Sequence, residues 1–140
     1  MENPIRENTE NKSVENHSNG YYIVDFDSSG IQGLDGISGL LNGTVIIFYT
    51  AKHNSITFEV AEKIMRSPAE ISFSRIDKPE DYYFVLSTHL GFIVGAEPNK
   101  KYIIVSNSEQ VNTAVSYWTK KDIDIKVLSN ISGKNRQKRD

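Results

Sequence analysis

Hydrophobic and polar positions follow two different periods along the middle of this chain, and the two periods alternate. Short apolar runs, or a strict alternation of apolar and polar residues, predict β-strands, whereas apolar residues spaced three or four apart predict helices. The predicted strands cover residues 21–26, 44–49, 70–76, 102–105 and 123–128, and the predicted helices between them cover residues 31–41, 56–67, 80–90 and 109–121.

Polar residues and prolines indicate where these helices begin and end. Ser55 and Ser108 precede two of them and suit the N-cap position, and Pro79 suits the first turn of a third. Pro68 ends the second helix, and Gly91 follows the third. This third helix is apolar nearly all round, so we expect it to be largely buried.

Strands that alternate with helices predict a parallel sheet with helices on both faces. Right-handed crossovers leave few topologies for about five such strands. We therefore predict an α/β fold, a three-layer α/β/α sandwich with the strand order 3-2-1-4-5.

Both ends of the chain differ from this body, which we predict to be one folded domain of residues 20–130. Residues 1–19 are rich in Asn and Glu and poor in apolar side chains, which predicts a disordered segment. The polar, mostly basic composition of residues 131–140 predicts a flexible tail. Such a tail could tether nucleic acid or keep the protein soluble. The charged residues of this tail are Lys134, Arg136, Lys138, Arg139 and Asp140.

Composition excludes several classes of protein. The 16 basic and 18 acidic residues give a net charge of −2, so the strong basicity of a duplex-binding protein is missing. The absence of cysteine excludes disulfides, thiolate zinc sites and thiol nucleophiles. No apolar run approaches the roughly 20 residues of a membrane span, and no apolar signal core follows Met1, so we expect a cytoplasmic protein that does not engage membranes.

A site is expected where the winding of the sheet reverses, at the carboxyl ends of the first and fourth strands, because ligands of open parallel sheets bind there. Polar residues follow both of these strands and also the second one. These crevice residues are Asp25, Asp27 and Ser28 after the first strand, Thr50 after the second, and Ser106, Asn107, Ser108 and Asn112 after the fourth.

Asp25 is the best single candidate for chemistry, because a carboxylate at the end of a buried strand is costly unless it is paired or metal-bound. The alternative is that Asp25 caps the helix that starts near Ile31 or stabilises the turn. Asp27 is two residues further on, so it would point to the same side as Asp25 on one strand, or else form the turn. His53 and His89 lack metal-ligand spacing with each other.

Five stretches of the body follow one another along residues 20–128. They are VDFD (24–27), VIIFYT (45–50), VLSTHLGF (85–92), YIIVSNS (102–108) and SYW (116–118). With these stretches in this order, the body resembles the bacterial PIN-like domains of the PIN-domain ribonuclease superfamily.

This resemblance implies a small metal-dependent ribonuclease, whose three or four acidic residues hold Mg²⁺ or Mn²⁺ at the reversal of the sheet. The family's strand-one Asp falls on Asp25 and its neighbouring position on Asp27. The other acidic positions fall on Tyr83, Ser108 and Asn112, none of which supplies negative charge. Most of the acidic site is therefore replaced, with Asp25 left as a metal ligand, and we expect either no cofactor or weakly bound Mg²⁺ or Mn²⁺.

Three functions stay open at this point. The expected one is a PIN-like domain with a degenerate acidic site, which binds nucleic acid or acts as a regulatory module. The second is an active Mg²⁺- or Mn²⁺-dependent endoribonuclease, in which Asp77 or Asp81 supplements Asp25 and Asp27. The third is a phosphotransferase of the haloacid-dehalogenase type, whose Asp-x-Asp signature fits residues 25–27 and whose strand-two hydroxyl fits Thr50. The resemblance implies RNA or a protein as the partner and is compatible with a homodimer.

Overall fold

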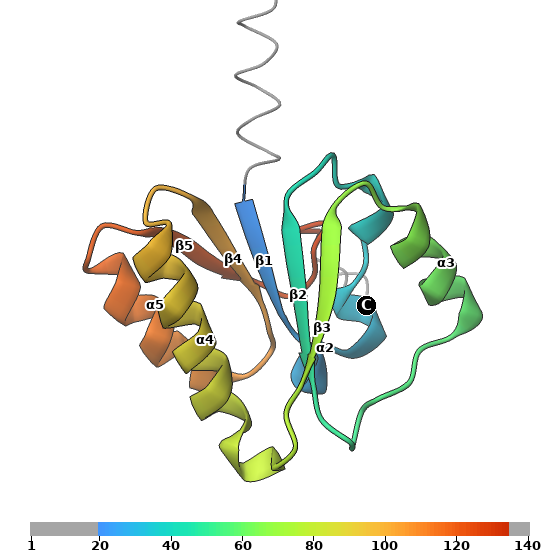
Figure 1. Cartoon of the computed structure of the whole chain (residues 1–140), viewed down its shortest axis with the longest axis horizontal. Coiled ribbons are helices and arrows are strands. Elements are labelled where there is room, and N and C mark those ends of the chain that lie inside the picture. Colours follow the sequence, from blue (N-terminus) through green and yellow to red (C-terminus); the bar gives the residue numbers. More distant parts are fainter. Residues whose placement is uncertain (1–19, 135–140) are drawn as a thin grey trace, which may run out of the picture.

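A five-stranded parallel sheet forms the centre of the molecule in a computed structural model, which describes residues 20–134 (Figure 1). The strand order is β3-β2-β1-β4-β5, as the sequence predicts, and every neighbouring pair is parallel. The strands are β1 (Gly20–Asp25), β2 (Thr44–Tyr49), β3 (Glu70–Arg75), β4 (Lys101–Val105) and β5 (Asp124–Leu128).

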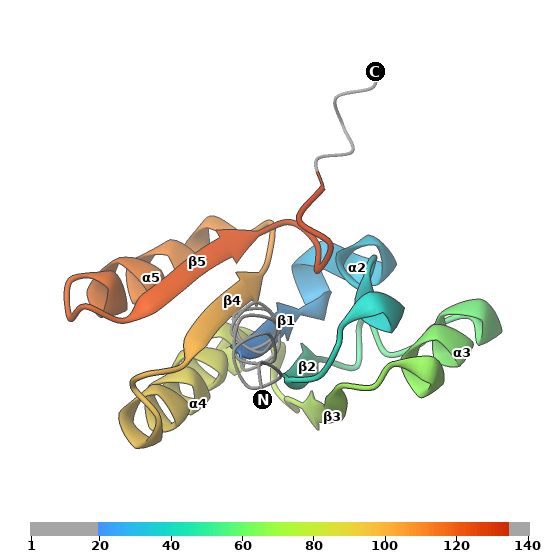
Figure 2. The same ribbon diagram turned by 90° about the horizontal axis from the view of Figure 1, so that it is seen from above.

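Helices cover both faces of this sheet and complete the three layers (Figure 2). One face carries α4 (Tyr82–Ala96) and α5 (Asn112–Thr119), and the other carries α2 (Phe26–Gly33) and α3 (Phe58–Arg66). Short 3₁₀ helices occur at η1 (Ile37–Gly39), η2 (Pro79–Asp81) and η3 (Glu109–Val111). The predicted α/β/α sandwich is therefore confirmed.

Two apolar clusters, one on each face of the sheet, form the core. Successive residues of a strand point to opposite faces. Ile23 of β1 accordingly packs under α4, while Val24 packs against α2, and both are fully buried. The central strands are apolar on both faces because both faces are covered.

The first helix differs from its prediction, because it begins directly after β1 rather than at Ile31. The strand ends at Asp25, whose carboxylate accepts a hydrogen bond from the backbone N–H of Ser28 and so caps α2. The helix ends at Gly33, and Gly36 has a φ of 101°, outside the range of a right-handed helix. Leu34, Ile37 and Leu40 therefore reach the core from a turn, a 3₁₀ helix and the position after it. Ile31 and Leu41, which the stripe also includes, are exposed.

The second helix begins later than predicted, because Thr57 rather than Ser55 is its N-cap and accepts from the N–H of Val60 at 3.1 Å. The α4 helix is longer than predicted and continues through Gly91 to Ala96. It is also less buried than its composition predicts, because Phe84 and Phe92 are 74% and 77% exposed. Ser108 does cap η3, as predicted, through the N–H of Gln110.

The chain remains packed on the body beyond residue 130. Ile131 is buried, and its N–H donates to the carbonyl of Gly33 at 3.0 Å. Ser132 donates in the same way to the carbonyl of Asp35. The predicted disordered segment, residues 1–19, and residues 135–140 of the predicted basic tail lie outside the described residues. Within residues 20–134, no helix has the length and apolar character that crossing a membrane requires.

Two glycines should respond to Ala in opposite directions. A Cβ at Gly91 would lie 3.5 Å from the Trp118 ring, an ordinary contact, so Gly91→Ala should raise the free energy of unfolding by up to about 1 kcal/mol through helix propensity. At Gly36, φ is positive and a Cβ would lie 2.8 Å from the backbone of Ser132. Gly36→Ala should therefore lower the free energy of unfolding by more than about 1 kcal/mol. Urea unfolding of both variants measures the two changes, and equal effects would contradict the described turn.

Candidate functional site

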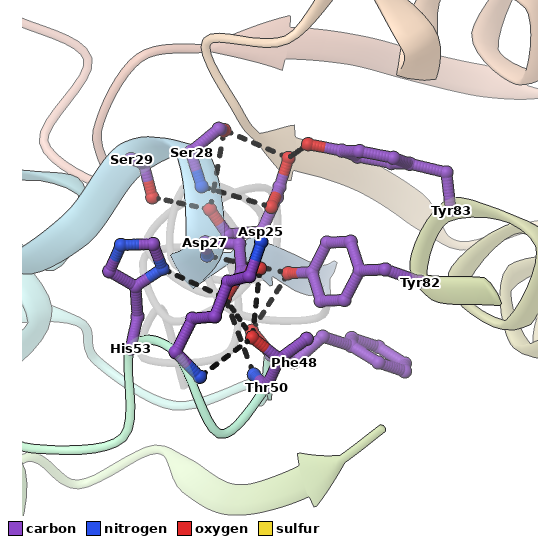
Figure 3. A network of polar contacts seen from close by, with 10 residues as sticks. Asp25, Asp27, Ser28, Ser29, Phe48, Thr50, His53, Tyr82 and Tyr83 are labelled. Carbon is purple, nitrogen blue, oxygen red and sulfur yellow. Dashed lines mark hydrogen bonds and ion pairs between the residues drawn. The ribbon is translucent and has the colours of Figure 1, made fainter. Parts of the chain in front are cut away.

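The carboxyl ends of β1, β2 and β4 meet at the reversal of the sheet, and polar side chains from these ends gather there (Figure 3). Asp25 and Asp27 come from the junction of β1 with α2, and Thr50 follows β2. Tyr82 and Tyr83 reach the same place from the first turn of α4. The site therefore joins elements that are distant in sequence.

The Asp25 carboxylate is the centre of this site and is fully buried. Its Oδ2 accepts hydrogen bonds from three hydroxyl groups, those of Ser106 at 2.7 Å, Ser28 at 2.8 Å and Tyr83 at 2.8 Å. We call this arrangement of Asp25, Ser28, Tyr83 and Ser106 the hydroxyl cluster. Hydrogen bonds to an ionised acceptor are stronger than neutral ones, so the cluster satisfies the buried charge without a cation.

A second set of hydrogen bonds orients the serines of the hydroxyl cluster. The Ser28 hydroxyl accepts from the backbone N–H of Asn107 at 2.9 Å, and the Ser106 hydroxyl accepts from that of Ser108 at 3.0 Å. The Asn107 side-chain amide donates to the carbonyl of Ser28 at 3.4 Å. Because their oxygens accept from the backbone, both serines have their protons free to donate to Asp25.

Burial keeps the two tyrosines of α4 protonated. It raises the pKa of Tyr83 to about 12, an increase to which the Asp25 charge contributes and which contact with Ser108 reduces. Burial also raises the pKa of Tyr82, and here too the Asp25 charge contributes. The Tyr82 hydroxyl donates to the carbonyl of Phe48 at 2.9 Å. Both phenols are therefore hydrogen-bond donors at neutral pH.

Asp27 has a separate set of partners. It lies in the first turn of α2, so it does not share a strand face with Asp25 as the sequence suggests. Its carboxylate accepts from the Thr50 hydroxyl at 3.0 Å and lies 3.3 Å from Nδ1 of His53. The His53 side chain is 54% exposed, whereas that of Asp27 is 18% exposed. Thr50, which is fully buried, therefore anchors an acidic group that faces the surface.

The remaining candidates lie outside these contacts. Asn112 opens α5 and is exposed, and among the described residues it has no hydrogen bond to the hydroxyl cluster. Asp77 is 90% exposed on its side chain and forms an ion pair with Arg75 at 3.4 Å. Asp81 is exposed at the end of η2. His89 of α4 is half-buried and packs edge-on against Phe48.

Sequence reasoning named Ser28 and Ser106 as crevice residues but did not anticipate that hydroxyl groups donate to Asp25. Tyr83 and Ser108 were recognised as positions without charge, but the Tyr83 phenol closes over Asp25. Ser29 also contributes, because its hydroxyl donates to the Asp25 carbonyl at 2.8 Å. The available signal was the pair of tyrosines three and four residues after Pro79, at a helix start that faces the reversal of the sheet.

Comparison with known families agrees with this fold. A family model described as PIN domain matches residues 19–128, which is most of the chain. The chain belongs to the PIN domain family. A search of the curated proteins finds no match.

The residues of this PIN domain do not fit the divalent ion that the family implies. Mg²⁺ and Mn²⁺ favour several oxygen ligands with negative charge, whereas the oxygen of Asp25 that faces the site already accepts three hydrogen bonds. Within residues 20–134, no group of three or more His, Cys, Asp or Glu side chains is arranged to hold a metal ion. The three hydroxyl groups donate their protons to Asp25, whereas a cation bound there would need oxygen lone pairs directed at it.

Removal of the Asp25 carboxylate should be the most destabilising change at this site. Asp25→Ala leaves one buried and two partly buried hydroxyls without this acceptor and removes the cap of α2, so the free energy of unfolding should fall by about 3 kcal/mol or more. Asp27→Ala, at a partly exposed carboxylate, should cost about 1 kcal/mol. Chemical denaturation compares the two, and a smaller loss for Asp25→Ala would contradict the structural role of the hydroxyl cluster.

The raised pKa of Tyr83 predicts a stability loss at alkaline pH. A phenol that ionises at about pH 10 when unfolded but at about 12 when folded stabilises the native state fully below pH 10. This contribution is lost as the pH rises from about 10 to about 12. Tyr83→Phe should reduce the loss measured by urea unfolding across this range, whereas Tyr117→Phe, at an exposed tyrosine of α5, should leave it unchanged.

Proposed function

We propose that this PIN domain binds its ligand at the reversal of the sheet without cutting it, as a nucleic-acid-binding or regulatory module. The observation that carries the proposal is the hydroxyl cluster, in which three neutral donors surround a fully buried carboxylate. Metal-dependent hydrolysis needs carboxylates that bind the cation and thereby activate a water molecule. Tyr83 occupies one of the positions that the family resemblance assigns to an acid. Instead of adding a negative charge, its hydroxyl donates a hydrogen bond to the acid that remains, Asp25.

Two alternative functions have less support from the contacts. A nuclease with an atypical acid set would need Asp77 or Asp81 beside Asp25, but Asp77 is directed to Arg75 and the surface. A phosphotransferase would need Asp25 as an accessible nucleophile, but its carboxylate has no exposed surface and accepts hydrogen bonds on the oxygen that faces the site. Both alternatives require the hydroxyl cluster to open.

RNA is the ligand that the family favours, and the edge of the site offers groups that suit its backbone. Asn107 and Lys52 are exposed there, and the imidazole of His53 is exposed next to them. Lys, His and amide side chains are common donors to phosphate and sugar oxygens. Because the predicted folded body carries a net charge of −3, this interaction should be modest and should weaken with salt.

The test is to separate binding from cleavage on the same RNA. Labelled single-stranded RNA should stay intact for hours with Mn²⁺, and calorimetry should detect no Mn²⁺ binding tighter than about millimolar, because too few charged ligands remain. Binding of the RNA should persist in EDTA.

Asp25→Asn is the matched variant, because it keeps the shape of the side chain and removes its charge. If the domain does not cut RNA, the RNA should stay intact with Asp25→Asn just as it does with the unmodified chain. Micromolar Mn²⁺ affinity, together with RNA cleavage that Asp25→Asn abolishes, would establish the nuclease instead. Intact RNA without detectable binding would favour a protein partner.

A further inference from the structure

A cavity lies beside the reversal of the sheet, and the hydroxyl cluster does not use it. Its volume is about 150 Å³, and residues of α2, β2 and β3 line it together with the loop after β2. Phe26, Leu34 and Ile47 form its deep part and are almost fully buried. Phe73 of β3 and Ile56 of the loop are 55% and 37% exposed, so they lie at its mouth. The cavity is therefore apolar inside and open to solvent.

The size of this cavity suits a single aromatic ring. An engineered apolar cavity of about 150 Å³ in another protein, lined by Leu, Ile and Phe, binds benzene, whereas pockets for drug-sized ligands measure about 300–1,000 Å³. The walls supplied by Phe26 and Phe73 are themselves aromatic, and aromatic rings pack well in stacked or edge-to-face contact. A system of two fused rings would leave part of its apolar surface outside.

One side of the cavity is polar. His53, Asn54 and Ser55 are consecutive in the loop after β2, and all three line the cavity. Nδ1 of His53 lies 3.3 Å from the Asp27 carboxylate, which orients the imidazole (Figure 3). An amide and a hydroxyl each both donate and accept hydrogen bonds, so these side chains suit a ring that carries nitrogen and oxygen at its edge. A hydrocarbon ring would offer them no hydrogen bond.

A positive charge stands next to this polar side. Lys52 directly precedes His53 and is exposed. Its backbone N–H donates to the buried Thr50 hydroxyl at 3.2 Å, which holds the start of the loop against the candidate site. A ligand whose ring enters the cavity would therefore extend its outer part past an ammonium group, as the phosphate of a nucleotide requires.

We propose that this cavity holds one pyrimidine base of single-stranded RNA, with the ring between the apolar walls and its polar edge toward residues 53–55. The inference rests on the proposed function, because it takes RNA as the ligand, and it adds which nucleotide is recognised. A pyrimidine has one ring, whereas a purine has two. Proteins commonly bind the unstacked bases of single strands by stacking on aromatic side chains and by hydrogen bonds to the base edges. We call this cavity the base pocket.

Fluorescence anisotropy with labelled RNA octamers tests the preference. Octauridylate and octacytidylate should bind the full chain at least about fivefold more tightly than octaadenylate, which is the effect of one well-stacked base. Equal binding of the three octamers, or tighter binding of octaadenylate, would overturn the base pocket and leave the proposed RNA binding intact. Absence of binding by all three would overturn both proposals.

Three variants separate base recognition from contact with phosphate. Phe73→Ala should weaken octauridylate binding at least about fivefold and leave octaadenylate binding unaltered, because it removes one wall of the base pocket. Lys52→Ala should weaken both octamers alike, because phosphate contacts carry no sequence information. The matched control is Phe92→Ala, 77% exposed on α4, which should leave both affinities unchanged. Circular dichroism shows that each variant is folded, and an equal loss for both octamers with Phe73→Ala would overturn the proposal.

Photocrosslinking locates the base on the unmodified chain, so it does not depend on any variant. An octauridylate with one iodinated uridine should crosslink on irradiation to an aromatic side chain that contacts the base. Mass spectrometry should place the crosslink on Phe26, Phe73 or His53, which line the base pocket. A crosslink confined to Phe84 or Tyr117, which are exposed on α4 and α5, would overturn the proposal even if pyrimidines bind more tightly.

Discussion

A buried carboxylate that has hydrogen bonds but no ion pair within residues 20–134 is the constraint on which this site depends. Asp25 lies at the end of the central strand with no exposed surface, and its charge is balanced by hydroxyl dipoles of Ser28, Tyr83 and Ser106. Each donor comes from a different element, so satisfying one carboxylate fixes β1, α2, β4 and α4 relative to one another. Polar groups that are fully satisfied rigidify and specify the surrounding fold.

The same constraint explains how this PIN domain can keep the fold of its family without the side chains for metal-dependent chemistry. The sheet order brings the ends of β1 and β4 together whatever side chains they carry. Several acidic side chains at these strand ends can bind a cation, whereas a single acidic side chain among hydroxyl groups forms hydrogen bonds with them. The proposed loss of cleavage and the rigidity of the site are therefore two results of one set of hydrogen bonds.

The sequence predicts the fold well and the site in part. The five strands and their order follow from short apolar runs and the rules of right-handed crossovers, because burial on both faces leaves an unambiguous pattern. Asp25, Asp27, Thr50 and Ser106 were predicted to lie at the reversal of the sheet because strand ends can be read from that pattern. Asp25 was considered as a helix cap, but the start of α2 at Phe26 was missed because the glycines of residues 31–41 disguise a turn as a helical stripe. The part of Tyr83 in the hydroxyl cluster was missed because Tyr83 meets Asp25 only through tertiary packing.

Adjacent residues of α4 face opposite environments. Tyr83 points inward to Asp25, and Phe84, the next residue, points to solvent. Successive side chains on a helix are rotated by about 100°, so the two cannot be reoriented independently while the helix stays intact. A contact that shifted α4 from its outer side would therefore also move the phenol that donates to the concealed carboxylate.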